Sequence, residues 1–358
     1  RVSTVQTLAA YLDDEITAMP NLVTVGAGGT ASTVAGIPFY SADTSSIYTT
    51  DVSGTDDTAS GNSAYGYQAL DAITTGDNNV AIGLSALGAN TTGAGNIAVG
   101  MSSLDANTTG GTNTGIGHFA LSANTTASFN TAVGNASMVT NTVGHSNTAV
   151  GSSSLNALTT GDYNVAIGFN AGQLMTEGDR SVAIGPFALD AATTGQYNVG
   201  VGSSALGLVT TSGNNVAVGT SALAANTAAE NTAIGHSAAQ SNTSGVRIIA
   251  IGAGAYDSSD TENDNIAIGF DAMTTNTAGG QHNLAIGNYT LDALTSGDGN
   301  IAIGNSAMGA ATTAESNTAI GYQALDANTT GNINVAIGYD ALGALTTADA
   351  NVAVGREA

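Results

Sequence analysis

The chain has 358 residues, including 48 glycines, 27 acidic residues and four arginines, and it has no lysine, cysteine or tryptophan. Its formal net charge of -23 argues against nucleic acid and anionic membrane surfaces as partners, because both require a basic patch. The missing lysine and cysteine exclude P-loop and Schiff-base lysines, thiolate nucleophiles, disulfides and cysteine zinc sites.

Residues 1–20 are predicted to form a short helix. Apolar side chains recur along it at steps of three and four residues, at Val5, Leu8, Leu12, Ile16 and Met19. This spacing is a heptad-like seam, and Pro20 is expected to end the helix. We expect a coiled-coil-like element, although an amphipathic helix of a small globular cap would give the same pattern.

Residues 21–61 are predicted to connect this helix to the rest of the chain. Two stretches, 21–29 and 36–54, have the composition of short strands interrupted by Gly, Ser, Thr and Asp. We expect this segment to cap the end of the following repeat region, because an open strand edge invites aggregation.

Residues 62–358 repeat with a period of 17. The repeats, here called coils, start at 62, 79, 96, 113, 130, 147, 164, 181, 198, 215, 231, 248, 265, 283, 300, 317, 334 and 351. Only two intervals differ, one of 16 residues and one of 18. Such regularity indicates a parallel β-solenoid or β-roll of about 18 coils, and we call the residues at one position of all coils a column. Coils spaced by about 4.8 Å would build a rod roughly 80 Å long.

Each column has a physical interpretation. Positions two to four, such as Val80-Ala81-Ile82, alternate in size and are predicted to form a strand with alanine on its inner face. A second short strand is expected at positions such as Ser85-Ala86-Leu87. The fifth position is always glycine, where the strand must turn. These turn glycines include Gly83, Gly100, Gly117, Gly134, Gly151 and Gly168.

Two polar columns are expected to form ladders of hydrogen bonds between coils. The first position is asparagine in 16 of 18 coils, with Ser181 and Ile248 as the exceptions. Its members include Asn79, Asn96, Asn113, Asn130, Asn147 and Asn164. Threonine at the thirteenth position is expected to form a second ladder through its hydroxyls. Column ten holds Asp71, Asp105, Asp190, Asp257, Asp292 and Asp326, never in adjacent coils, as repulsion between stacked charges requires.

The outer face of the predicted strands is apolar along the whole repeat. Its fourth-position residues are Ile82, Val99, Ile116, Val133, Val150, Ile167, Ile184, Val201, Val218, Ile234, Ile251, Ile268, Ile286, Ile303, Ile320 and Ile337. A stripe of this size is far larger than soluble monomers expose. We therefore expect several chains to turn these columns toward a common axis, and a narrow wedge-shaped coil favours three.

The units NVAIG, NTAIG and SVAIG, each followed by a small residue and Ala-Leu, resemble the head repeats of YadA-type trimeric autotransporter adhesins. They are still more similar to NTAIGYQAL-type repeats of bacteriophage fibre proteins, as in residues 317–325. The resemblance covers 62–358 and implies a homotrimeric, left-handed parallel β-roll with the valine and isoleucine columns at the axis. It also implies a fibre for attachment on a virion surface, or alternatively on a bacterial surface. The implied partners are other fibre components and a host-surface glycan or protein receptor.

No catalytic constellation is evident in the sequence. His118 and His236 share a column but lie seven coils apart, and the other histidines, His145 and His282, are also isolated. We expect no cofactor; weak calcium binding in the acidic segment 257–264 is the one metal hypothesis. Arg180 and Arg247, which interrupt the polar turns, are expected to pair with local carboxylates.

Three functional classes remain after this reasoning. A non-enzymatic structural fibre without nucleic-acid binding or membrane insertion agrees best with the columns. An ice-binding solenoid is suggested by the threonine column, but flat arrays usually need Thr-x-Thr. A glycan-degrading β-helix would need a groove lined with carboxylates, whereas the acids are scattered over coils and columns.

Overall fold

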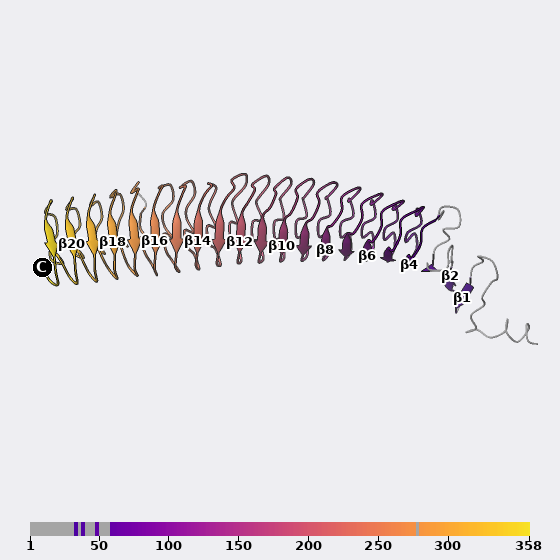
Figure 1. Ribbon diagram of the computed structural model, residues 1–358, viewed down its shortest axis with the longest axis horizontal. Coiled ribbons are helices and arrows are strands. Elements are labelled where there is room, and N and C mark those ends of the chain that lie inside the picture. The colour runs from indigo at the N-terminus through magenta and orange to yellow at the C-terminus, as the bar shows by residue number, and fades with distance from the viewer. Residues whose placement is uncertain (1–31, 35–36, 40–46, 50–57, 277–278) are drawn as a thin grey trace, which may run out of the picture. The chain divides into compact units, whose positions relative to one another are not determined.

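The computed structural model describes residues 32–34, 37–39, 47–49, 58–276 and 279–358, and the described residues contain strands and turns but no helix. They belong to two units, 1–143 and 144–358. Each unit contains a parallel β-solenoid, and together they have about 18 coils (Figure 1). The predicted all-β solenoid is thus confirmed. The helix predicted for 1–20 lies outside the described residues.

The described residues of the first unit contain eight strands. They are β1 (Ser32–Val34), β2 (Ile37–Phe39), β3 (Ile47–Tyr48), β4 (Ser63–Tyr65), β5 (Val80–Ile82), β6 (Ile97–Val99), β7 (Thr114–Ile116) and β8 (Thr131–Val133). Strands β1 and β2 form an antiparallel pair. From β3 to β8 each strand pairs in parallel with the next. Because β3 already pairs with β4, parallel stacking includes residues that precede the 17-residue repeat.

The second unit contains thirteen strands, all paired in parallel with their neighbours. They are β9 (Thr148–Val150), β10 (Val165–Ile167), β11 (Val182–Ile184), β12 (Val199–Val201), β13 (Val216–Val218), β14 (Thr232–Ile234), β15 (Ile249–Ile251), β16 (Ile266–Ile268), β17 (Leu284–Ile286), β18 (Ile301–Ile303), β19 (Thr318–Ile320), β20 (Val335–Ile337) and β21 (Val352–Val354). The register places each column above itself, as in Ala166 opposite Ala183. It also holds across the 16-residue and 18-residue coils.

The core of each coil is a thin layer between the strand and the segment that returns to it. Alanine at position three is buried, as are the alanine and leucine at positions eight and nine. These columns are in contact: a Cβ added to Gly200 at position three would lie 3.3 Å from Cγ of Leu189. A larger residue at position three would therefore overpack the interior, because the leucine column already fills that space.

The second strand expected in each coil is absent from the described coils. At Ser85-Ala86-Leu87 the φ angles of Ser85 and Leu87 are 54° and 51°, in the left-handed region. Such residues reverse the local direction of the chain, so the segment is a series of turns and the prediction was wrong. The backbone nevertheless bonds to the next coil, since Leu87 N–H donates to the Ser103 carbonyl at 3.0 Å.

Candidate functional surface

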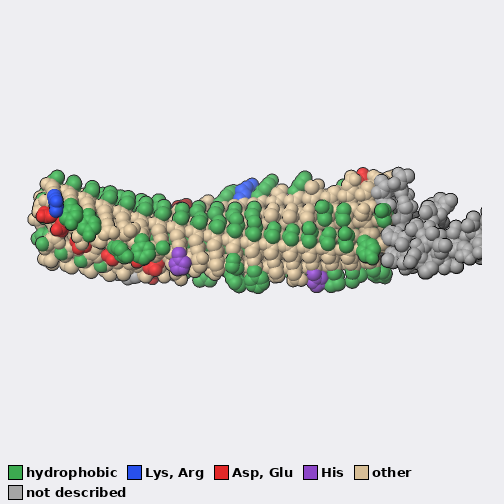
Figure 2. Space-filling view, turned by 90° about the horizontal axis from the view of Figure 1, so that it is seen from below, with side chains coloured by type: hydrophobic (Ala, Val, Ile, Leu, Met, Phe, Trp, Pro, Cys, Tyr) green, Lys and Arg blue, Asp and Glu red, His purple; other side chains and the backbone are tan. Residues whose placement is uncertain are grey.

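The strands present one apolar face to solvent, here called the strand face, which consists of the side chains at positions two and four. Valine and isoleucine side chains on it are 36–44% exposed at Ile82, Ile97, Ile116, Ile167, Val218, Ile234, Ile249, Ile301, Ile320 and Ile337. Figure 2 shows rows of hydrophobic side chains across the strands of each unit. Alanine at position three faces the opposite way and is buried. The strand face therefore contains the expected columns, and its exposure makes it the candidate interaction surface.

The asparagine column binds successive coils through both atoms of its amide. Oδ1 of Asn283 accepts the backbone N–H of Asn300 at 2.9 Å and the side-chain Nδ2–H of Asn300 at 3.0 Å. Nδ2 of Asn300 also donates to the Ala314 carbonyl at 2.7 Å. Each such asparagine thus bonds the coil before it and the turn that closes its own coil, which makes the column a support for the strand face.

The two exceptions in this column are accommodated differently. Oγ of Ser181 still accepts the backbone N–H of Asn198 at 3.2 Å. Ile248 has no such acceptor, and the next coil is supported by Tyr256, which is fully buried and whose hydroxyl accepts from Nδ2 of Asn265 at 2.8 Å. Burial raises the pKa of Tyr256. A tyrosine at position nine therefore replaces one of the missing contacts of the ladder.

A second asparagine ladder lies at position twelve and was missed by sequence analysis. Nδ2 of Asn107 donates to Oδ1 of Asn90 at 3.0 Å, and the same bond joins Asn124 to Asn107 and Asn242 to Asn226. The residues are buried. The column is interrupted by leucine, alanine and isoleucine, for example at Leu158, so its identity is less regular than that of the first column.

The threonine column bonds to the backbone rather than to neighbouring hydroxyls. Oγ1 of Thr91 donates to the Thr108 carbonyl at 3.1 Å, and Thr312 does the same to Thr329. The expected hydroxyl ladder was therefore wrong in its acceptor. Because these hydroxyls donate hydrogen bonds to carbonyls of the next coil, the column does not favour the ice-binding alternative.

The turn glycines are needed for two reasons at once. Gly83 has a φ of 133°, which is open mainly to glycine. A Cβ added there would lie 2.6 Å from the Gly100 carbonyl oxygen, closer than real Cβ atoms approach. Gly100, Gly117, Gly134, Gly151 and Gly168 share the positive φ. The glycine column thus permits close stacking at the end of each strand.

Aromatic side chains flank the strand face, and one group of them surrounds Arg180. The guanidinium carbon of Arg180 lies 5.4 Å from the ring centre of Tyr163 and 5.7 Å from that of Tyr197. Nη1 of Arg180 also donates to the Tyr197 hydroxyl at 3.3 Å. Among the described residues Arg180 has no ion pair. The carboxylate partner expected for Arg180 was therefore wrong, and cation–π contacts take its place.

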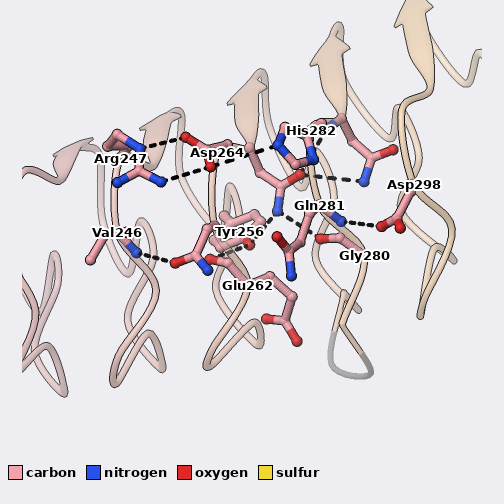
Figure 3. A network of polar contacts seen from close by, with 12 residues as sticks. Val246, Arg247, Tyr256, Glu262, Asp264, Gly280, Gln281, His282 and Asp298 are labelled. Atoms are coloured by element: carbon pink, nitrogen blue, oxygen red, sulfur yellow. Dashed lines mark hydrogen bonds and ion pairs between the residues drawn. The ribbon is translucent and has the colours of Figure 1, made fainter.

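Arg247 does pair with a carboxylate, as predicted. Its Nε and Nη2 donate to the two oxygens of Asp264 at 2.6 and 2.8 Å, and Nε2 of His282 lies 3.8 Å from Asp264 Oδ2. Figure 3 shows these side chains following one another over successive coils. The hydrogen bonds from Arg247 lower the pKa of Asp264. The ion pair between Arg247 and Asp264 is exposed to solvent, so it orders these side chains locally and adds little to the stability of the fold.

The acidic segment 257–264 directs its carboxylates to different partners. Asp257 accepts from the Ser258 hydroxyl, and Asp264 pairs with Arg247. Glu262 is buried and accepts backbone N–H bonds from Asp260, Thr261 and Gly279 at 3.0–3.2 Å. In the described parts of the chain no three His, Cys, Asp or Glu side chains form a group that could hold a metal ion.

The four histidines lie in four different coils. His118 contacts Asn135 and the ring of Phe119, His145 donates its backbone N–H to Asp162, and His236 is exposed. The structure therefore brings together assembly columns rather than acid–base groups.

Within the described residues, no helix has the length and apolar character needed to cross a membrane. No protein-family model matches the chain, and a search of curated proteins finds no relative.

Proposed function

We propose that this chain is a non-enzymatic structural fibre protein that self-associates through its strand face and serves surface attachment. The observation that carries the proposal is the solvent exposure of the valine and isoleucine columns over a regular solenoid. Soluble monomers rarely expose contiguous apolar surface on this scale. Rotational symmetry would cover the strand face of every copy at once.

Three copies fit the shape of the coil best. The coil has a single strand whose inner face carries only alanine, so it is narrow and can approach an axis as a wedge. A homotrimer of this kind agrees with the resemblance of the repeats to fibre and adhesin head repeats. On the same basis we place the fibre on a bacteriophage virion, with host-surface attachment as its role.

Self-association is tested by measuring the mass of the intact chain in solution by light scattering at micromolar concentration. The expected mass is about three times the 34.8 kDa of one chain. Ile167→Asp should reduce it to that of one chain while the β-sheet circular dichroism persists, because an unpaired charge would be buried at the axis. Thr160→Asp is the matched control on an exposed turn and should leave the trimer intact. A wild-type monomer would refute self-association, and a trimeric Ile167→Asp variant would show that another face is used.

A further inference from the structure

The side of each coil away from the strand face carries a groove in the second unit. Position three points inward onto the leucine of position nine, so positions two and four point away from the segment that holds positions seven to eleven. In five successive coils residues of that segment line an open hollow of about 550 Å³. Association through the strand face would therefore leave this groove open to solvent.

Two leucines of one column line the groove. Position eleven is alanine in most coils, but it is leucine at Leu174 and Leu208, with Ala191 between them. These leucine side chains are 51% and 57% exposed. Their backbone N–H groups donate to carbonyls of the next coil, at Asp190 and Ala224, at 3.1 and 3.0 Å. The backbone N–H groups of both leucines are thus occupied by bonds between coils.

The polar side chains of the groove provide both donors and acceptors. Gln173 and Gln240 lie at its two ends, with Asp190 and Ser204 between them. Partial burial raises the pKa of Asp190. Gly207 keeps the space beside this carboxylate open, because a Cβ there would lie 3.6 Å from Asp190 Oδ1.

The same arrangement occurs at a second hollow. There Asp292 is followed by Ser306 and Gly309 at the spacing that relates Asp190 to Ser204 and Gly207. This hollow has a volume of about 370 Å³ and includes Tyr289 and Asp326. A Cβ on Gly309 would lie 3.5 Å from Asp292 Oδ1 and 2.9 Å from Asp326 Oδ1. The notch beside an aspartate is therefore a repeated feature of this side of the coil.

The chemistry of the groove fits a neutral, polyhydroxylated chain. It spans five coils, or four steps of about 4.8 Å, which is roughly 19 Å and suits an extended ligand. Two carboxamides and two hydroxyls can donate to and accept from sugar hydroxyls, a carboxylate can accept from them, and the leucines can cover apolar sugar faces. No arginine lies in the lining to pair with an anionic sugar. A peptide would find no strand edge here, because the segment that lines the groove is a series of turns.

We propose that the groove lined by Leu174 and Leu208 binds a neutral oligosaccharide, and that the notch at Gly309 is a second, smaller subsite of the same kind. This inference rests on the proposed attachment function, for which it supplies the receptor class. Three chains in one fibre would present three copies of the groove, so weak single sites would combine into avid attachment.

The test uses the full chain against immobilised neutral oligosaccharides of two to six glucose, galactose or mannose units, their sialylated counterparts, and a lysine-rich peptide. We expect binding to neutral glycans alone, followed by calorimetry on the best one. Ala191→Trp should reduce its affinity at least tenfold by filling the groove, and Asp190→Asn about tenfold by removing an acceptor for hydroxyls. Ala123→Trp occupies the same column outside the groove and should bind as the wild type does.

Light scattering on the same samples separates the two proposals. Trimer mass without glycan binding would overturn the groove and leave the fibre, whereas a monomer mass would refute self-association. Binding of only sialylated glycans or only the basic peptide would overturn the ligand class. An Ala191→Trp variant that binds like the wild type would place the site elsewhere.

Discussion

Replacing one buried asparagine of the first column tests whether this ladder holds the coils together. Asn300 is suited to the test because its contacts run in both directions. It bonds Asn283 in one coil and Asn317 in the next, and its Nδ2 also reaches the Ala314 carbonyl. Asn300→Leu keeps the branched shape of the side chain and removes the polar contacts that the side chain makes.

The magnitude follows from the groups that lose their partners. The backbone N–H of Asn317 loses its acceptor at 3.1 Å, and the Ala314 carbonyl loses its donor at 2.7 Å. A buried polar group without a partner costs about 1–3 kcal/mol, so the two together cost about 2–6 kcal/mol. Asn300→Ser should cost less, because Ser181 shows that a hydroxyl at this position can still accept the backbone N–H of the next coil.

Amide hydrogen exchange followed by mass spectrometry measures this local cost. Peptides that contain residues 300 and 317 should exchange about 30-fold faster or more in Asn300→Leu, since 2 kcal/mol corresponds to roughly that factor. Asn300→Ser should lie between that variant and the wild type, and Asn305→Ser at an exposed position should match the wild type. Exchange within twofold of the wild type in Asn300→Leu would show that the ladder does not stabilise the stack.

Gly168→Ala should destabilise the coil by at least about 1–3 kcal/mol, because its φ of 139° strains any other residue; a lower thermal midpoint by circular dichroism is the readout, and an unchanged midpoint would contradict the clash. Thr312→Val should cost about 0.5–1.5 kcal/mol by removing the bond to the next coil, whereas Thr313→Val at the exposed neighbour should be neutral in the same melt. Asp292 and Asp326 have raised pKa values, chiefly through burial, so their protonation favours the folded state. This stabilisation is complete below the unfolded pKa near 3.8 and is lost as the pH rises through the folded pKa. Changing both residues to asparagine should therefore flatten the dependence of the thermal midpoint on pH above 3.8, and an unchanged slope would refute the coupling.

The repeat, the strand and the inward alanine could be predicted because each column has one dominant residue type. Val80-Ala81-Ile82 alternates with the period of a strand, and its burial pattern follows that alternation. The second strand was predicted on similar alternation around Ala86. It failed because Ser85 and Leu87 have φ angles in the left-handed region, and the adjacent side chains of Ala86 and Leu87 are both buried, which a pleated strand does not allow on one face.

Details that depend on neighbouring coils were harder to predict. Asp179 follows Glu177 and precedes Arg180, which suggested an ion pair, but Oδ1 of Asp179 accepts the backbone N–H of Asp162 at 2.8 Å. The guanidinium of Arg180 instead lies over the rings of Tyr163 and Tyr197, one coil away on each side. The groove had one signal in the sequence, namely the two leucines that interrupt an alanine column. That signal can be interpreted only once stacking places the two leucines two coils apart.

Positions seven, nine and seventeen of the coil have consequences for how the chain acquires its structure. Non-glycine residues there have φ near +50° to +60°, as at Ser85, Leu87 and Asn78. At about 1–3 kcal/mol each, three such residues cost a coil roughly 3–9 kcal/mol before any neighbour is present. Many of the hydrogen bonds that offset this cost come from adjacent coils, so a coil by itself lacks much of what stabilises its native shape. We therefore expect folding to proceed by the addition of coils to an existing stack, with the formation of the first pair of coils as the slow step.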